Sequence, residues 1–542
     1  MGGATLVGIG ILASRLAGIV RTKVIAYYFG IGLVADIFTW ASKFPNFLQN
    51  LLGEGALSAS FIPVYAELVE KGRRDESGRV AGAVLALLVA AVTGIAGLSM
   101  VLLPFAMPVL TPKFDAETRA LAVTSARLIL PSTAVLVLSA WALGVQNAHR
   151  KFLMSYLAPV ASSVAVIAAV LIFGGVLGWT DRALLLAALG GTFVGAVLQL
   201  LVQLPTVLAL EPALKIRFDT GLEGVRTTLR NAGPTVAGRG VVQLSSWLDL
   251  WLALLLAAGG ASSLGFAQQL YMLPISLFGV AIVAAELPEL ARQREDASGA
   301  IRTRINAAME RALFYVVPST VAFLVLGPMI GAGALGGREF GSDDARLVGW
   351  ILRAYAIGLV ASTLSRVASS AFYALQDSRT PAVVAGFRVA LSAVAAVLFM
   401  VQLEPVLFLP AGFLSHLRIG DFRLGAVGIA AGTSIAAWAE WAILRRRLAV
   451  RIGPVGPRLG VLARIGVAAA AGGAAGFGVE AMLPANALGA GWVMTLAYAA
   501  LCCSAFGLVY LAVAAALRVE EVTSLLGRVR GRRSGGSGPR PS

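Results

Sequence analysis

Charged residues interrupt the apolar sequence at the start of this chain. Within the first seventy residues, stretches long enough to cross a bilayer contain Arg15, Arg21, Lys23, Asp36, Lys43 and Glu54. A charge at the centre of a membrane helix costs about 2.5 to 3.5 kcal/mol on insertion scales, so such side chains normally face a protein-lined aqueous cavity. These charges therefore predict a transport protein.

One of these stretches, residues 32–68, carries three of the charges in register. On an ideal helix at about 100° per residue, Asp36, Lys43 and Glu54 fall within about 20° of one stripe. We therefore expect a single long helix that is tilted or protrudes from the membrane and has one face exposed to water.

The composition also indicates a membrane protein. Of the 542 residues, 58% are hydrophobic and 13% are charged, whereas about a quarter of the residues of a soluble domain are charged. Apolar windows of about 20 residues predict an all-α protein with about fourteen transmembrane helices. The expected spans are 4–28, 32–68, 81–110, 120–147, 154–178, 183–210, 228–258, 262–291, 307–333, 344–375, 380–403, 425–448, 461–483 and 491–517. The first span lacks the pattern of a cleaved signal peptide and is expected to stay attached.

Basic residues are distributed unevenly between the two sides of these spans. Clusters of Arg and Lys follow even-numbered spans, in segments 71–79, 149–151, 215–226, 292–304, 445–458 and 518–540. The positive-inside rule therefore predicts that both termini are cytoplasmic. We attribute the net charge of +16 to this orientation and to anionic lipid, because no soluble domain accompanies it that would favour nucleic-acid binding.

Patterns of catalytic or metal-binding residues are not evident in the sequence. The two histidines, His149 and His416, and the adjacent Cys502 and Cys503 do not have metal-ligand spacing, so we expect no cofactor. A glycan polymerase would be expected to carry a large outer loop with catalytic carboxylates, but the predicted outer segments are short. A membrane scaffold would gain nothing from buried charges. An integral membrane enzyme is left as the alternative to a transporter.

A weak internal repeat is present in the spacing of Gly and Pro. Gly30 and Pro45 have the same separation as Gly259 and Pro274, about 230 residues further along the chain. Six predicted spans lie between the copies, and an even number preserves orientation, so the repeat predicts two parallel lobes around a cavity; chance spacing is the alternative. The expected domains are a six-helix lobe at 1–211, a second at 221–450, two further helices at 459–518 and a basic, disordered tail at 519–542.

Several motifs along the chain resemble those of one family. They include Ser14-Arg15-Leu16-x-Gly18-x-x-Arg21, Lys43-Phe44-Pro45-Asn46, Glu54-Gly55-Ala56-Leu57-Ser58 and the block from Phe372 to Pro381. In these motifs the chain is similar to the MurJ/MviN lipid II flippases of the multidrug/oligosaccharidyl-lipid/polysaccharide exporter superfamily. The resemblance implies two six-helix lobes plus two helices and a central cavity. It also implies alternating access that moves an undecaprenyl-pyrophosphate-linked peptidoglycan precursor across the bacterial inner membrane.

The expected partners follow from the same resemblance. They are the lipid-linked precursor and membrane lipids, and the cell-wall synthesis machinery is left open as a further partner. We expect a monomer that binds no nucleic acid.

Cations suit an anionic cargo, because the planar fork of arginine binds phosphate oxygens with two donors. Arg15 and Arg21 match family cavity positions, with snorkelling toward a membrane face as the alternative. Gln49 and Gln269 stand where the family usually has arginine, which leaves another polyprenyl-linked glycan as alternative cargo. A drug/cation antiporter of the same superfamily is a further alternative. The substrate-binding candidates are Arg15, Arg21, Asp36, Lys43, Gln49, Glu54, Arg239 and Gln269. The positive charge absent at Gln49 and Gln269 could be supplied by other cations, for which the candidates are Lys43, Arg239 and Arg366. The alternative for each of the three is a structural ion pair.

Two further residues are candidates for ion coupling. Family members described as sodium-binding use an acid of the seventh span, matched here by Asp249, and an Asn and an Asp of the eleventh, where this chain has Arg388 and Ser392. We expect Arg388 to pair with Asp249 and to replace the ion; a lipid-facing Arg388 is the alternative. Coupling to a monovalent cation stays open.

Overall fold

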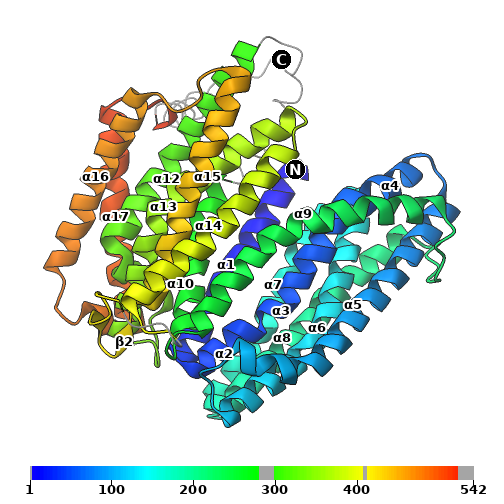
Figure 1. Cartoon of the computed structure of the whole chain (residues 1–542), viewed down its shortest axis with the longest axis horizontal. Helices are drawn as coiled ribbons and strands as arrows, with labels where there is room; N and C mark the ends of the chain where they lie inside the picture. The colour runs from blue at the N-terminus through cyan, green and yellow to red at the C-terminus, as the bar shows by residue number, and fades with distance from the viewer. Residues whose placement is uncertain (1–2, 280–297, 407–411, 523–542) are drawn as a thin grey trace, which may run out of the picture. The chain divides into compact units, whose positions relative to one another are not determined.

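The computed structural model describes residues 3–279, 298–406 and 412–522. Helices make up almost all of these residues (Figure 1). The strands in the described ranges form one antiparallel hairpin of β1 (Arg418–Ile419) and β2 (Phe422–Arg423), in which Arg418 lies opposite Arg423. Ten of the described helices are long and apolar enough to cross a membrane. The all-α integral membrane fold expected from the sequence is confirmed.

The chain divides into two compact units, which are described separately. Unit 1 comprises residues 1–265, 337–340 and 406–409, and unit 2 comprises 266–336, 341–405 and 410–542. This division follows packing, whereas the lobes predicted at 1–211 and 221–450 follow a sequence repeat, and those lobes stay a prediction.

Unit 1 contains the first nine α-helices and the start of the tenth. They are α1 (Gly3–Phe29), α2 (Leu33–Ala41), α3 (Lys43–Leu48), the π-helical η1 (Gln49–Leu57), α4 (Ser58–Glu70), α5 (Arg74–Leu110), α6 (Ala116–Ala148), α7 (Phe152–Val170), the π-helical η2 (Leu171–Val176), α8 (Asp181–Leu210), α9 (Glu223–Leu254) and α10 (Gly260–Pro274).

Unit 2 contains the second part of α10 and the remaining elements. They are the π-helical η3 (Ile275–Gly279), α12 (Ser298–Leu335), α13 (Ser342–Ala374), α14 (Arg379–Leu403), the hairpin, α15 (Gly425–Ile452), α16 (Leu459–Met482), the 3₁₀ turn η5 (Ala487–Gly489) and α17 (Trp492–Ala516).

The ten apolar helices match ten of the predicted spans. They are α5, α6, α7 with η2, α8 and α12 to α17. The other four predicted spans are the first, second, seventh and eighth, which correspond to α1, α2 to α4, α9 and α10 and hold most of the charged and polar candidates. Part of the eighth span, 262–291, and most of the tail, 519–542, lie outside the described residues. The count of fourteen helices therefore stays a prediction.

The second predicted span is not one continuous α-helix, so the expectation of a single long helix is wrong and the charged stripe built on it stays a prediction. Asp36 lies in α2, Lys43 begins α3, and the backbone of Glu54 lies in η1. A π-helical turn contains more residues than an α-helical turn, so it rotates the positions that follow out of ideal register. This segment approaches α6 closely, because a Cβ added to Gly53 would lie 2.5 Å from the Cβ of Ala140.

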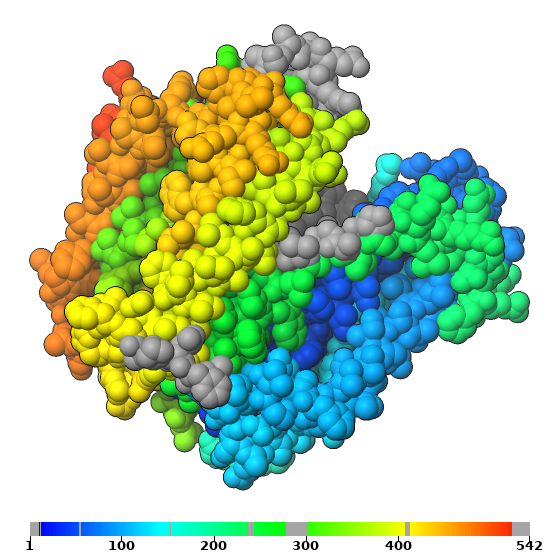
Figure 2. Space-filling view, viewed as in Figure 1, coloured from blue at the N-terminus to red at the C-terminus, as the bar shows by residue number. Residues whose placement is uncertain are grey.

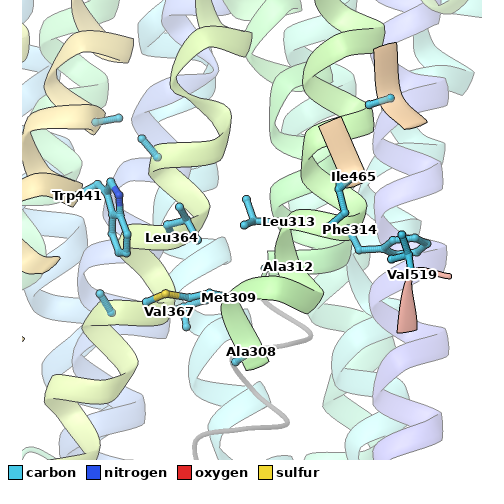
Figure 3. Close-up of a cluster of buried hydrophobic side chains, with 14 of the residues drawn as sticks. Ala308, Met309, Ala312, Leu313, Phe314, Leu364, Val367, Trp441, Ile465 and Val519 are labelled. Carbon is cyan, nitrogen blue, oxygen red and sulfur yellow. The ribbon is translucent and has the colours of Figure 1, made fainter. Parts of the chain in front are cut away.

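Each unit has an apolar core of its own. In unit 1, buried side chains of α4, α5 and α6 meet, among them Phe61, Val80 and Trp141. In unit 2, the core joins α12, α13, α15, α16 and α17, and Figure 3 shows Leu364 and Trp441 within it. On the surface of unit 2, α14 and α15, coloured yellow to orange, lie side by side (Figure 2). This packing positions the helices that carry the charged side chains of unit 2.

A proline in unit 2 leaves a helix carbonyl without its usual donor, and an arginine supplies one. Pro328 of α12 has no N–H to bond the carbonyl of Leu324. Arg353 of α13 donates from Nε to that carbonyl at 2.9 Å. The helices cross closely here, since a Cβ added to Gly349 would lie 2.5 Å from the nitrogen of Pro328.

Unit 1 contains the same contact. Pro104 of α5 leaves the carbonyl of Met100 without its helical donor. Arg127 of α6 donates from Nε to that carbonyl at 3.3 Å. The corresponding residues of the two units are about 225 positions apart in the sequence, close to the offset expected from the Gly and Pro spacing. The contact therefore supports an internal repeat.

We expect Arg353→Met to lower the free energy of unfolding by about 1 to 3 kcal/mol, because the Leu324 carbonyl would lose its donor in an apolar setting. In a Pro328→Ala background residue 328 supplies an N–H, so the same substitution should cost less. Thermal unfolding in detergent measures this difference as a double-mutant cycle.

The matched control is Arg346→Met on the same helix, because Arg346 is exposed and pairs with Asp343. It should give the same small change in both backgrounds. An Arg353→Met cost that is unaffected by Pro328→Ala would show that the arginine does not serve the freed carbonyl.

Candidate functional site

The carboxylate of Asp36 holds the start of α10. Asp36 is 2% exposed, and its two oxygens accept hydrogen bonds from the backbone N–H groups of Gly259, at 2.7 Å, and Ser262, at 2.6 Å. A carboxylate at a helix N-terminus satisfies donors that have no partner within the helix. Asp36 was expected among substrate-binding residues, but the structure gives it this anchoring contact.

Lys43 and Asp249 bring opposite charges together in unit 1. Lys43 begins α3, Asp249 lies in α9 and is 5% exposed, and the two charges lie close enough to attract each other. Aromatic rings surround this region: Trp247 lies 4.7 Å from Phe44, centroid to centroid, and 5.6 Å from Phe47. Both alternatives for Lys43, restored cavity charge and structural partner, stay predictions.

The cations of α1 differ in exposure. Arg15 is exposed, whereas Arg21 and Lys23 are partly buried. Arg15 and Arg21 are about 120° apart around an ideal helix, so the two guanidinium groups point in different directions. Exposed Arg15 fits the snorkelling alternative, and Arg21 is the better placed of the two for a protein-lined site.

The other candidates of unit 1 and α10 are placed only in part. Gln49 is the first residue of η1, Gln269 lies in α10, and both are partly buried. The backbones of Glu54 and Arg239 lie in η1 and α9, but their side chains lie outside the described part of the chain. The roles assigned to these four residues stay predictions.

Arg388 pairs with Glu440, and not with Asp249 as expected. Nη1 of Arg388 lies 3.1 Å from Oε2 of Glu440, with side-chain exposures of 32% and 9%. The cause is the packing of α14 beside α15, and the hydroxyl groups of Ser392 and Thr433 join the same two helices at 3.3 Å. Reasoning from the sequence missed Glu440, although an acid within the predicted span 425–448 was a signal of the same kind as the charges near the N-terminus.

Further polar groups lie near this pair. Tyr271 of α10 donates from its hydroxyl to Ser362 at 3.1 Å and stacks on Tyr355 at 4.8 Å. Arg366 of α13 is exposed and lies within electrostatic range of Arg388, Glu440 and Tyr271. The groups in this cluster come from α10, α13, α14 and α15. Across the described part of the chain, no cluster of His, Cys, Asp and Glu suits a metal ion.

The motif from Phe372 to Pro381 closes the turn between α13 and α14. Asp377 accepts hydrogen bonds from the N–H of Thr380 at 2.9 Å and from its hydroxyl at 2.7 Å, and it pairs with Arg451 of α15. The Thr380 hydrogen bonds, and then the Arg451 charge, hold the pKa of Asp377 below its ordinary value. The motif therefore has a structural role at the end of two helices.

Asp377→Asn should lower the melting temperature at neutral pH and have little effect in acid. A carboxyl group with a lowered pKa contributes stability above its unfolded-state pKa, and that contribution is lost as the pH falls through the folded-state value. Thermal unfolding across pH measures it, with exposed Asp421→Asn in the hairpin as the control. A loss from Asp377→Asn that is independent of pH would contradict the ionic contribution.

Two units built of apolar helices define a multi-pass membrane protein. The chain resembles a solved structure described as "Lipid II flippase MurJ, inward closed conformation", with a TM-score of 0.76 and 21% identity over 96% of this chain and 100% of that one. It also resembles an inward-facing multidrug resistance MATE family transporter of the MOP superfamily, with a TM-score of 0.64 and 16% identity over 83% and 99%.

Sequence comparison identifies the family. The family described as "Lipid II flippase MurJ" matches residues 25–490. A protein of Burkholderia cenocepacia named lipid II flippase MurJ is 31% identical over 74% of this chain and 76% of its own length. A probable lipid II flippase MurJ of Rhizobium tropici is 30% identical over 82% of each. The chain belongs to the MurJ family.

Proposed function

We propose that this chain is a lipid II flippase of the cytoplasmic membrane. It moves an undecaprenyl-pyrophosphate-linked peptidoglycan precursor from the inner to the outer leaflet by alternating access and forms no covalent bond. The observation that carries this proposal is the family match from residue 25 to residue 490, which covers most of both units. On this proposal the basic loops, and with them both termini, lie in the cytoplasm, and the protein acts as a monomer.

A pyrophosphate needs fixed cations in a protein-lined setting. Arg21 is partly buried in α1. Of the three family arginine positions on the first, second and eighth spans, it is the one that keeps an arginine, since Gln49 and Gln269 stand at the other two. An amide donates hydrogen bonds but contributes no net charge, so Arg21 carries a larger share of the attraction. The names of the relatives favour lipid II over another cargo.

A strain depleted of its own lipid II flippase tests the function directly. The wild-type chain should restore growth and lipid II in the outer leaflet, and Arg21→Ala should abolish both at normal membrane levels because the pyrophosphate loses a charge-assisted donor. Arg346→Ala, which removes an exposed arginine paired with Asp343, should behave like the wild type. Failure of the wild-type chain to restore growth at normal levels would overturn the proposal.

The Lys43 and Asp249 pair bears on coupling. A buried carboxylate needs a compensating partner, and Lys43 lies within electrostatic range of Asp249, so we propose that the lysine takes the place of a bound monovalent cation there. Transport would then not depend on sodium. Arg388, expected in this role from the sequence, is held by Glu440.

Transport by the wild-type chain should be equal in sodium and choline buffers. Lys43→Met should destabilise the protein because it removes a positive charge within electrostatic range of the buried Asp249, and sodium should recover part of that loss. Lys43→Met with Asp249→Asn should be more stable than Lys43→Met alone, with Lys23→Met of α1 as the control. Strong sodium dependence of the wild-type chain would contradict the role of Lys43.

A further inference from the structure

We propose that Arg366 and Arg388 form an oxyanion site within unit 2 that binds the pyrophosphate of the cargo, and that Glu440 occupies Arg388 when the cargo is absent. This inference rests on the proposed function and extends it to residues of α13, α14 and α15.

The direction of Arg366 follows from the exposure of α13. In the first half of the helix, Trp350 and Ile357 are exposed and lie about 20° apart, which defines an apolar face suited to lipid. In the second half, Arg366 and Tyr373 are exposed and also lie about 20° apart. Arg366 is about 180° from Ile357 around the helix. The guanidinium group therefore points away from the lipid-facing side.

The balance of charge around Arg366 favours an anion. Two guanidinium groups, of Arg366 and Arg388, lie within electrostatic range of one carboxylate, that of Glu440. One positive charge of this cluster is therefore not balanced by an acid among the residues that the structure describes. A like-charged pair inside a membrane protein is costly unless an anion joins it.

The geometry of the cluster suits a phosphate group. Arg366 and Arg388 each lie about two helical turns from the α13–α14 turn, so they are at one level of unit 2. Each guanidinium group carries five N–H donors in a planar fork that fits phosphate oxygens, and the 3.1 Å contact with Glu440 uses one donor nitrogen of Arg388. Arg388 is also 32% exposed, so it remains accessible to a ligand.

Binding to the purified full-length chain in nanodiscs tests the site. The probes are undecaprenyl pyrophosphate, undecaprenol and a short peptide with a free C-terminal carboxylate. Arg366→Gln should weaken binding of the pyrophosphate about tenfold or more and leave binding of the alcohol unchanged. Glu440→Gln should tighten binding of the pyrophosphate, because it removes the competing anion from Arg388. Arg346→Gln, an exposed arginine of the same helix, is the control.

The outcomes separate the site from the function. If the wild-type chain binds the pyrophosphate and neither Arg366→Gln nor Glu440→Gln changes its affinity, the site is overturned and the flippase proposal stands. If only the peptide loses affinity in Arg366→Gln, the site takes a carboxylate and the assignment is wrong. If the wild-type chain binds no pyrophosphate, both proposals fail. Arg366→Lys should retain part of the affinity, whereas a purely structural arginine would affect melting temperature alone.

Discussion

The high cost of an unpartnered polar group in hydrocarbon governs this structure. Water is not available there to replace a lost hydrogen bond, so each charge or open carbonyl needs a partner from the protein. Asp36 accepts hydrogen bonds from backbone N–H groups at the start of α10. Arg353 donates to the carbonyl that Pro328 frees, and Arg388 pairs with Glu440. In each case the partner comes from another helix, so satisfying the charge also fixes how two helices pack.

The same contact between an arginine and a carbonyl freed by proline occurs in both units. A proline in a membrane helix frees a backbone carbonyl, and a donor from a neighbouring helix can satisfy it. Arg127 serves α5 in unit 1 and Arg353 serves α12 in unit 2. Glycine and proline spacing alone was compatible with chance. A shared three-part contact at the same offset is a much more specific indication of an internal repeat.

The ten apolar spans were predictable because each is defined within its own sequence window. Contacts between residues of different sequence windows were not predictable in this way. The single long helix expected over residues 32–68 failed because the chain forms α2, α3, η1 and α4 there, and no propensity in the sequence marks a π-helical segment. The expected partner of Arg388 failed because pairing depends on which helices are neighbours, and α15 supplies Glu440 at a position that only packing reveals. The acid itself was visible in the sequence as a charge within an apolar span.

A flippase must release its cargo as well as bind it, and this requirement explains a carboxylate beside a cationic site. A guanidinium group left empty after release would be an unpaired charge in a poorly hydrated setting, and the cost of that empty state would oppose release. Glu440 lies 3.1 Å from Arg388 and replaces the departing phosphate, so Arg388 exchanges one anion for another. Arg366 keeps the excess positive charge that attracts the next cargo. On this argument the acid lowers the affinity for the cargo and thereby permits turnover.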